Sequence, residues 1–209
     1  MNGPKRGILI ALLILLAAGV YGALIMLLVQ RSSDDGPSEA SSGPFATALD
    51  GYPIAVEQAQ NWRADAEPIN VSASWRLPTK EMLRNGSPTW TYLFFSPSAG
   101  EAYRVEVNQE GTEGFPESSI SSVSNTIDTD QWLIDSRDAI LLFLSEGGEQ
   151  YLREEPVTTV RMRLSPTLSP GSVTWMISAL SSTEQTNRSF LIDAMTGEVT
   201  EAQPLPSRN

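Results

Sequence analysis

The segments Ser87–Ser96 (SPTWTYLFFS) and Ser172–Ser181 (SVTWMISALS) lie 85 residues apart and indicate how the chain is folded. Both begin with a serine, carry threonine and tryptophan at the third and fourth positions, and end on a second serine. Each is followed by a polar turn, a short apolar strand and a glycine-containing turn; the two strands are expected at Tyr103–Asn108 and Ser189–Asp193. The shared order of elements predicts an internal duplication.

A helix and an alternating strand are expected before the first of these segments. The helix is predicted to begin near Pro53, since proline is favoured in a first helical turn. Its apolar residues fall near one face: Ile54, Ala55, Ala59, Trp62 and Ala66. The strand is predicted over about Ile69–Leu77, with alternate residues pointing inward: Val71, Ala73, Trp75 and Leu77.

The second copy repeats this arrangement. Its helix is expected over about Asp135–Ser145, capped by Asp135 or Ser136 and ended by Gly147 and Gly148. The strand over about Pro156–Leu164 places apolar and basic residues on opposite faces: Val160, Met162 and Leu164 against Arg161 and Arg163. The predicted fold class is therefore α+β, with two tandem units, each a helix across a three-stranded antiparallel sheet.

An apolar run, Gly7–Val29, precedes these units and contains no charged residue. As a helix it would be about 34 Å long, enough to cross a hydrocarbon core of about 30 Å. Lys5 and Arg6 before it favour a cytoplasmic N-terminus and an extracytoplasmic domain. Because an exported domain without cysteine has no disulfides, a bacterial cell envelope is the expected location. The alternative, a cleaved signal peptide, would have a shorter apolar region and a small-residue cleavage site. We therefore expect a single-pass transmembrane helix that contacts membrane lipid.

The chain is accordingly divided into seven parts. Residues 1–6 form the cytoplasmic N-terminus, 7–30 the transmembrane helix and 31–45 a flexible linker. Residues 46–111 and 131–200 form the two units, 112–130 connect them, and 201–209 form a tail. Within the span, small residues at helical spacing suggest a face for a partner helix, although such residues are common in spans: Ala18, Gly19, Gly22 and Ala23.

The string Ile192–Val199 (IDAMTGEV) resembles the hairpin end of PepSY-type domains, in which a strand closes in Asp-Ala-x-Thr-Gly-Glu and then resumes. Asp193 can accept hydrogen bonds from the following amides, and Gly197 can take a positive φ. Asn108 and Gly111 form a weaker match in the first unit. The resemblance implies two tandem PepSY-like units behind the membrane anchor, with binding or inhibition of another protein rather than catalysis.

Composition excludes several kinds of chemistry. The chain has 14 Lys and Arg against 25 Asp and Glu, which argues against nucleic acid as a partner. It has no histidine and no cysteine, so the commonest general base, the commonest metal ligand and thiol nucleophiles are all missing. The densest acidic group lacks the spacing of a calcium loop and is interpreted as solvated loop and helix cap: Asp128, Asp130, Asp135 and Asp138. We expect no enzyme activity, no metal and no cofactor.

Two hypotheses for function follow. The first is a non-enzymatic, membrane-anchored PepSY-type module that binds a protein partner, with open sheet edges as candidate surfaces. The alternative is an accessory or assembly subunit of a larger membrane complex, in which the anchor is the working part. Of the tryptophans, Trp75, Trp90 and Trp175 are expected in the core. Trp132, just before the second helix, is expected either to be partly exposed or to pack that helix against the sheet.

Overall fold

The computed structural model describes residues 46–169, 171–182 and 187–202. They belong to one compact unit, which spans Ser41–Asn209. The predicted transmembrane span 7–30 lies outside the described residues, and so do the packing candidates Ala18, Gly19, Gly22 and Ala23. Within the described ranges, every helix is too short or too polar to cross a membrane.

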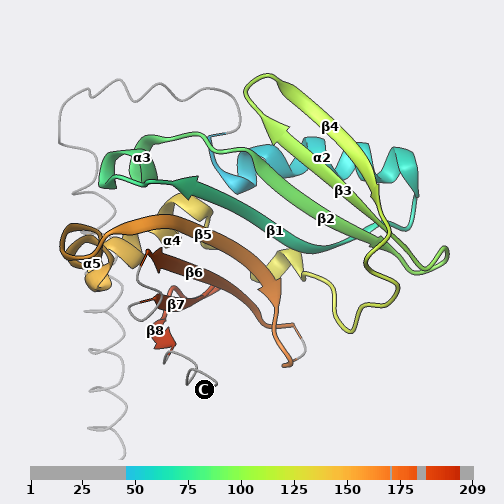
Figure 1. Ribbon diagram of the computed structural model, residues 1–209. Coiled ribbons are helices and arrows are strands. Elements are labelled where there is room, and N and C mark those ends of the chain that lie inside the picture. Colours follow the sequence, from blue (N-terminus) through green and yellow to red (C-terminus); the bar gives the residue numbers. More distant parts are fainter. Residues whose placement is uncertain (1–45, 170, 183–186, 203–209) are drawn as a thin grey trace, which may run out of the picture. The chain divides into compact units, whose positions relative to one another are not determined.

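A single antiparallel sheet of eight strands dominates the described unit (Figure 1). The strand order across it is β4-β3-β2-β1-β5-β6-β7-β8. The bounds are β1 Glu67–Arg76, β2 Trp90–Ser96, β3 Glu101–Asn108, β4 Gly111–Glu117, β5 Val157–Pro166, β6 Val173–Ser181, β7 Arg188–Asp193 and β8 Val199–Ala202. Strands β1 to β4 and strands β5 to β8 each run in chain order from the centre of the sheet to one edge, and β1 pairs with β5 at the centre.

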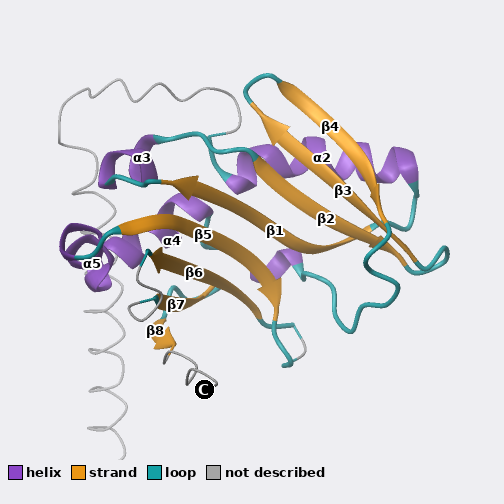
Figure 2. Ribbon diagram, in the orientation of Figure 1, coloured by secondary structure: helices purple, strands orange, loops and turns teal. Residues whose placement is uncertain are grey.

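Helices lie on one face of this sheet (Figure 2). Helix α2 (Ala48–Trp62) packs on β2, β3 and β4, and α4 (Ser136–Phe143) packs on β6. Two shorter helices, α3 (Lys80–Asn85) and α5 (Glu149–Glu154), follow β1 and α4. A 3₁₀ turn spans Thr129–Gln131, and a π-type turn over Leu144–Gly148 joins α4 to α5.

The predicted fold class is wrong. The two units do not form separate three-stranded sheets; each contributes four strands to one eight-stranded sheet. The strand missed in the first half is β4, which occupies part of the expected connection 112–130, and the one missed in the second half is β8. Pairing β1 with β5 removes two exposed strand edges, whose backbone groups would otherwise remain unpaired in the sheet.

The alternating pattern of β1 and β5 is confirmed in the core. Val71, Ala73 and Trp75 are buried on the helical face, together with three residues of β5: Val160, Met162 and Leu164. Leu77 was expected to continue this face but is 73% exposed. It lies just past the end of β1 with a φ of 46°, so although its amide still donates to the Thr158 carbonyl of β5 at 2.8 Å, the alternation of side chains ends there.

Aromatic side chains join the two halves under the sheet. Trp90 and Trp175, the matched residues of the duplication, have ring centroids 6.4 Å apart. The expectation that Trp75, Trp90 and Trp175 lie in the core is confirmed. Partial exposure of Trp132 is wrong, whereas the alternative of packing against the sheet agrees with the structure: the ring lies edge-on to Trp175 of β6 at 5.9 Å and is only 3% exposed.

The N-termini of α2 and α4 meet and share capping groups. Thr47 and Asp50 form a capping box for α2, so the helix begins five residues before Pro53. The Asp135 carboxylate accepts from the Ser136 amide of its own helix at 2.6 Å and from the Leu49 amide of α2 at 3.2 Å. The Ser136 hydroxyl accepts from the Ala48 amide at 2.9 Å. Asp135 is thus confirmed as a cap, and it also ties α4 to α2.

The predicted stop of the second helix is also confirmed. Gly147 has a φ of 107°, which an L side chain rarely adopts, and it breaks the helix after α4. The chain then resumes as α5, an element that the sequence pattern did not reveal.

Candidate functional site: the open face of the sheet

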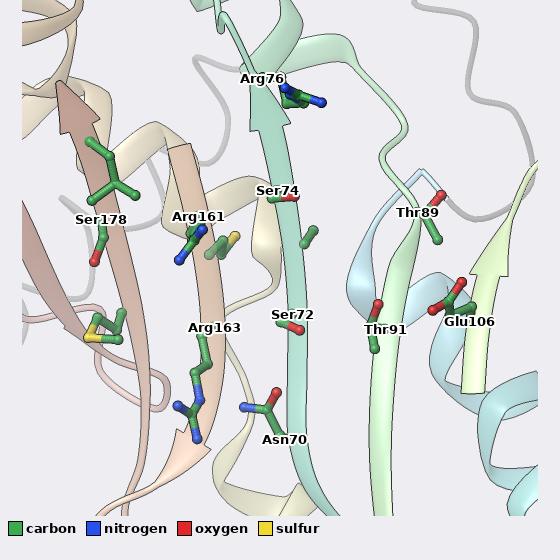
Figure 3. Close-up of a pocket in the computed structure, with 14 residues that line it drawn as sticks. Asn70, Ser72, Ser74, Arg76, Thr89, Thr91, Glu106, Arg161, Arg163 and Ser178 are labelled. Atoms are coloured by element: carbon green, nitrogen blue, oxygen red, sulfur yellow. The ribbon is translucent and has the colours of Figure 1, made fainter. Parts of the chain in front are cut away.

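The sheet face opposite the helices carries a groove of about 820 Å³ (Figure 3). It runs over the central strands, where β1 and β5 pair, and reaches β2, β3 and β6. Hydroxyl groups and arginines provide most of its polar lining: Ser72, Ser74, Thr89, Thr91, Ser178, Arg76, Arg161 and Arg163. Since these side chains alternate with the buried core residues of the same strands, the pleat itself places them on this face.

Strand register fixes which of these side chains are neighbours. Ser72 lies opposite Thr91 on one side and Arg163 on the other. Thr91 is opposite Glu106, and Arg163 is opposite Met176. One row of the groove therefore passes from an acidic end on β3, through hydroxyls, to a basic residue on β5.

Three arginines are spread along the central strands of the groove, with Arg76 at the end of β1 and Arg163 nearer Asn70 (Figure 3). Arg161 lies opposite Ser74, and Arg76 is two residues farther along β1, opposite Thr159. All three arginines are exposed, and none has an ion-pair partner within the described part of the chain. Figure 3 shows the Arg163 side chain reaching to the level of Asn70, whose amide donates to the Leu164 carbonyl at 2.9 Å.

The segment after β4 closes one end of the open face. Ile120 and Val123 pack on a small apolar cluster of Ile69, Phe95 and Ala102. The segment is held by the Ile127 amide, which donates to the Pro68 carbonyl at 2.7 Å, and by Asn125, whose amide donates to Thr167. The expected connection 112–130 therefore contains strand β4 and then a segment that packs over one end of the open sheet face. The rest of that face remains open.

Shifted pKa values fall on turns and on the core, away from the groove. Hydrogen bonds from Ser96 and Ser98 lower the pKa of the exposed Asp65 to about 2. Burial raises the pKa of Tyr52 to about 12 and that of Tyr92 higher still; the Tyr92 hydroxyl donates to the Ala48 carbonyl at 2.6 Å. These pKa shifts keep the Asp65 carboxylate charged and the Tyr52 and Tyr92 phenols neutral near pH 7. The charged carboxylate accepts hydrogen bonds, and the neutral Tyr92 phenol can donate one.

The acidic residues that lie close together in sequence between Asp128 and Asp138 have separate local contacts in the structure. Asp128 accepts from the Asp130 amide at the start of the 3₁₀ turn, while Asp135 caps α4. Among the described residues, no set of three or more acidic side chains is placed to hold a metal ion.

The hairpin chemistry behind the PepSY resemblance is present in both halves. Asp193 accepts from the amides of Met195 and Thr196, and these bonds lower its pKa, led by the Thr196 amide. Gly197 has a φ of 76°. In the first half, Asn108 accepts from the amides of Glu110 and Gly111 in the same way. This turn chemistry accounts for the string and does not by itself define a binding site.

Open sheet edges were proposed from the sequence as binding surfaces. In the observed sheet the two edge strands are β4 and β8. Strand β4 carries Glu113, Glu117 and Pro116, and charged residues and proline on an edge disfavour addition of another strand. The groove was not recognised in the sequence. Its available signal was the pair Arg161 and Arg163, two basic residues on the outer face of one strand in an acidic chain.

Comparison with known proteins does not place the chain in a family. No protein-family model matches it, and no curated protein matches it. A crystal structure of a putative lipoprotein from Clostridium difficile 630 has similarity at a TM-score of 0.45 and 12% identity, over 72% of this chain and 92% of that chain. The function proposed below therefore depends on the residues of this chain.

Proposed function

We propose that the chain is a non-enzymatic protein-binding module of the kind that the PepSY resemblance implies, attached to the cell membrane through its apolar N-terminal run, residues 7–30. The basic residues before the run favour a cytoplasmic N-terminus, with the sheet unit on the extracytoplasmic side. In this arrangement the open face of the sheet is the surface that contacts the partner.

The open groove over β1 and β5 is the observation that carries this proposal. The helices pack on the opposite face, so an extensive polar surface of rigid strands remains available. Binding surfaces built on strands hold their side chains more precisely than surfaces built on loops. The groove also contains exposed arginines, a residue type that is enriched in protein interfaces.

An enzymatic role based on acid–base catalysis by carboxyl groups has weaker support than protein binding. A carboxylic acid that donates a proton near neutral pH needs a raised pKa. Where a carboxylate pKa is shifted in the described residues, the shift is downward, because hydrogen bonds stabilise the anion: Asp65, Glu117, Glu149 and Asp193. These side chains lie on turns and helix ends and do not line the groove.

Site-specific photocrosslinking in intact membranes tests the proposal. A benzophenone amino acid would replace Ser74, which is exposed within the groove, and in a matched chain Gln60, which is exposed on α2. We expect a discrete crosslinked protein from position 74 and none from position 60. Crosslinking only from position 60, or from neither, would contradict the proposed binding face.

A further inference from the structure

Three arginines without counter-charges are the least explained feature of the open face. Arg161 and Arg163 are two residues apart on β5, and Arg76 of β1 lies diagonally from Arg161, opposite Thr159. The ion pairs formed by described residues do not include these three arginines, although the Glu106 of one pair lines the same groove: Arg63–Glu101, Lys80–Glu149, Arg104–Glu106 and Arg153–Glu154. The basic patch, defined here as Arg76, Arg161 and Arg163, is therefore a concentration of positive charge on a chain with a formal net charge of −11.

The acidic residue of the same row does not neutralise this patch. Glu106 lies three strands away from Arg163, through Thr91 and Ser72, which is about 14 Å at the usual strand spacing. That separation exceeds the screening length of about 8 Å at physiological salt. Glu106 is also engaged by Arg104, whose Nε lies 3.5 Å from a carboxylate oxygen. Arg161, which lies between the other two, thus experiences like-charge repulsion with little compensation.

We infer that the basic patch binds an acidic segment of a partner protein, an inference that rests on the proposed protein-binding function and adds the chemistry of the partner. Each planar guanidinium can hold a carboxylate through two parallel hydrogen bonds. Residues two apart on a strand are separated by about 6.7 Å, so Arg161 and Arg163 match carboxylates two residues apart on an extended segment.

The surroundings of the patch favour a peptide segment over a flat anionic surface. The arginines line a groove together with Ser72, Ser74 and Ser178. The hydroxyls of Ser72 and Ser74 can donate to the backbone carbonyls of a peptide lying across this face of the sheet, whereas the Ser178 hydroxyl is 2.8 Å from that of Ser189 and shares a hydrogen bond with it. A lipid bilayer presents a plane, whereas an extended segment can enter the groove with its side chains pointing at the arginines.

Binding of a fluorescein-labelled oligoglutamate to the full chain in a neutral detergent tests this inference. The variant R161E/R163E removes the central charges of the patch. Its matched control, R84E/R137E, makes the same change in net charge at exposed arginines of α3 and α4, outside the groove. We expect binding that weakens as salt rises, a loss of roughly tenfold or more in the groove variant and little loss in the control.

Several results would overturn the inference. They are an equal loss in both variants, no binding of oligoglutamate to the native chain, or tighter arginine-dependent binding of inorganic polyphosphate. Crosslinking from position 74 separates this inference from the proposed function. If the crosslinked protein persists in R161E/R163E, the binding face stands and the acidic chemistry is wrong; if the native chain gives no crosslink, the proposed function itself fails.

Discussion

The two halves of the sheet, β1–β4 and β5–β8, share their order of strands but differ in what they display on the open face. Under the helices they are alike: Trp90 and Trp175 occupy matched strands and touch across the centre. In the groove on the open face, the first half presents Glu106 and Arg76, whereas the second presents Arg161 and Arg163 and no acidic residue. The buried face thus repeats the residues that determine the fold, while the open face is where the halves are chemically distinct.

The largest expected effect comes from the matched tryptophans. Trp90→Ala and Trp175→Ala should each lower the free energy of unfolding by about 3–5 kcal/mol, because both rings are fully buried. Their phenylalanine variants should differ by about 1 kcal/mol. Trp175 Nε1 donates to the Ile134 carbonyl at 2.8 Å, whereas Trp90 Nε1 has no partner among the described residues. Urea unfolding followed by circular dichroism measures both, and equal costs for the two phenylalanine variants would contradict the assigned asymmetry.

The junction of the helices should give the next largest effect. Asp135→Ala removes an acceptor from the first turn of α4 and from that of α2, so we expect a loss of about 1–2 kcal/mol. Asp128→Ala is the control, since its carboxylate caps a single 3₁₀ turn. Thermal unfolding compares the variants, and a cost for Asp135 no greater than that for Asp128 would show that the shared cap does not couple the helices.

The two hairpin turns should differ in their response to acid. Asp193 has a lowered pKa in the fold, so its contribution is present above its unfolded pKa and is lost as pH falls through its folded pKa. The corresponding residue of the first half, Asn108, does not titrate. Asp193→Asn should therefore reduce the loss of stability below about pH 4, by at most about 1 kcal/mol. Urea unfolding at a series of pH values tests this prediction. Asn108→Asp is expected to add a further loss of stability in acid. If neither variant changes the dependence of stability on pH, the prediction is wrong.

The smallest effect on stability is expected in the groove. R161E/R163E should change the free energy of unfolding by only about 0.5 kcal/mol, because exposed side chains without partners contribute little. Chemical denaturation of this variant is also the folding control for the peptide experiment. A large loss would mean that the arginines support the sheet and would remove the distinction between the two faces.

Local patterns predicted much of this architecture. Alternation over residues 71–75 and 160–164 identified the core faces of β1 and β5, and Asp135 with Gly147 bounded α4. These features depend on neighbouring residues, which a sequence displays directly. The capping box at Thr47 and Asp50 was equally local but was overlooked, since Pro53 gave a competing start signal.

The fusion of the two sheets could not be read in the same way. Pairing of β1 with β5 joins residues such as Arg76 and Thr159, and no local pattern encodes which strand meets which. Strand β4 was missed because glycine and proline, both depleted in strands, interrupt it at Gly114 and Pro116. The groove depends on this central pairing, so the arginines acquired a shared location only in three dimensions.

The central pairing of β1 with β5 has a consequence for biosynthesis. Strands β1 to β4 emerge from the ribosome well before β5, so throughout that interval β1 has hydrogen-bonding groups along one side without their final partner. Unpaired strands invite association with other chains. During synthesis, the unpaired side of β1 must therefore be protected from other chains until β5 has emerged from the ribosome and can pair with it.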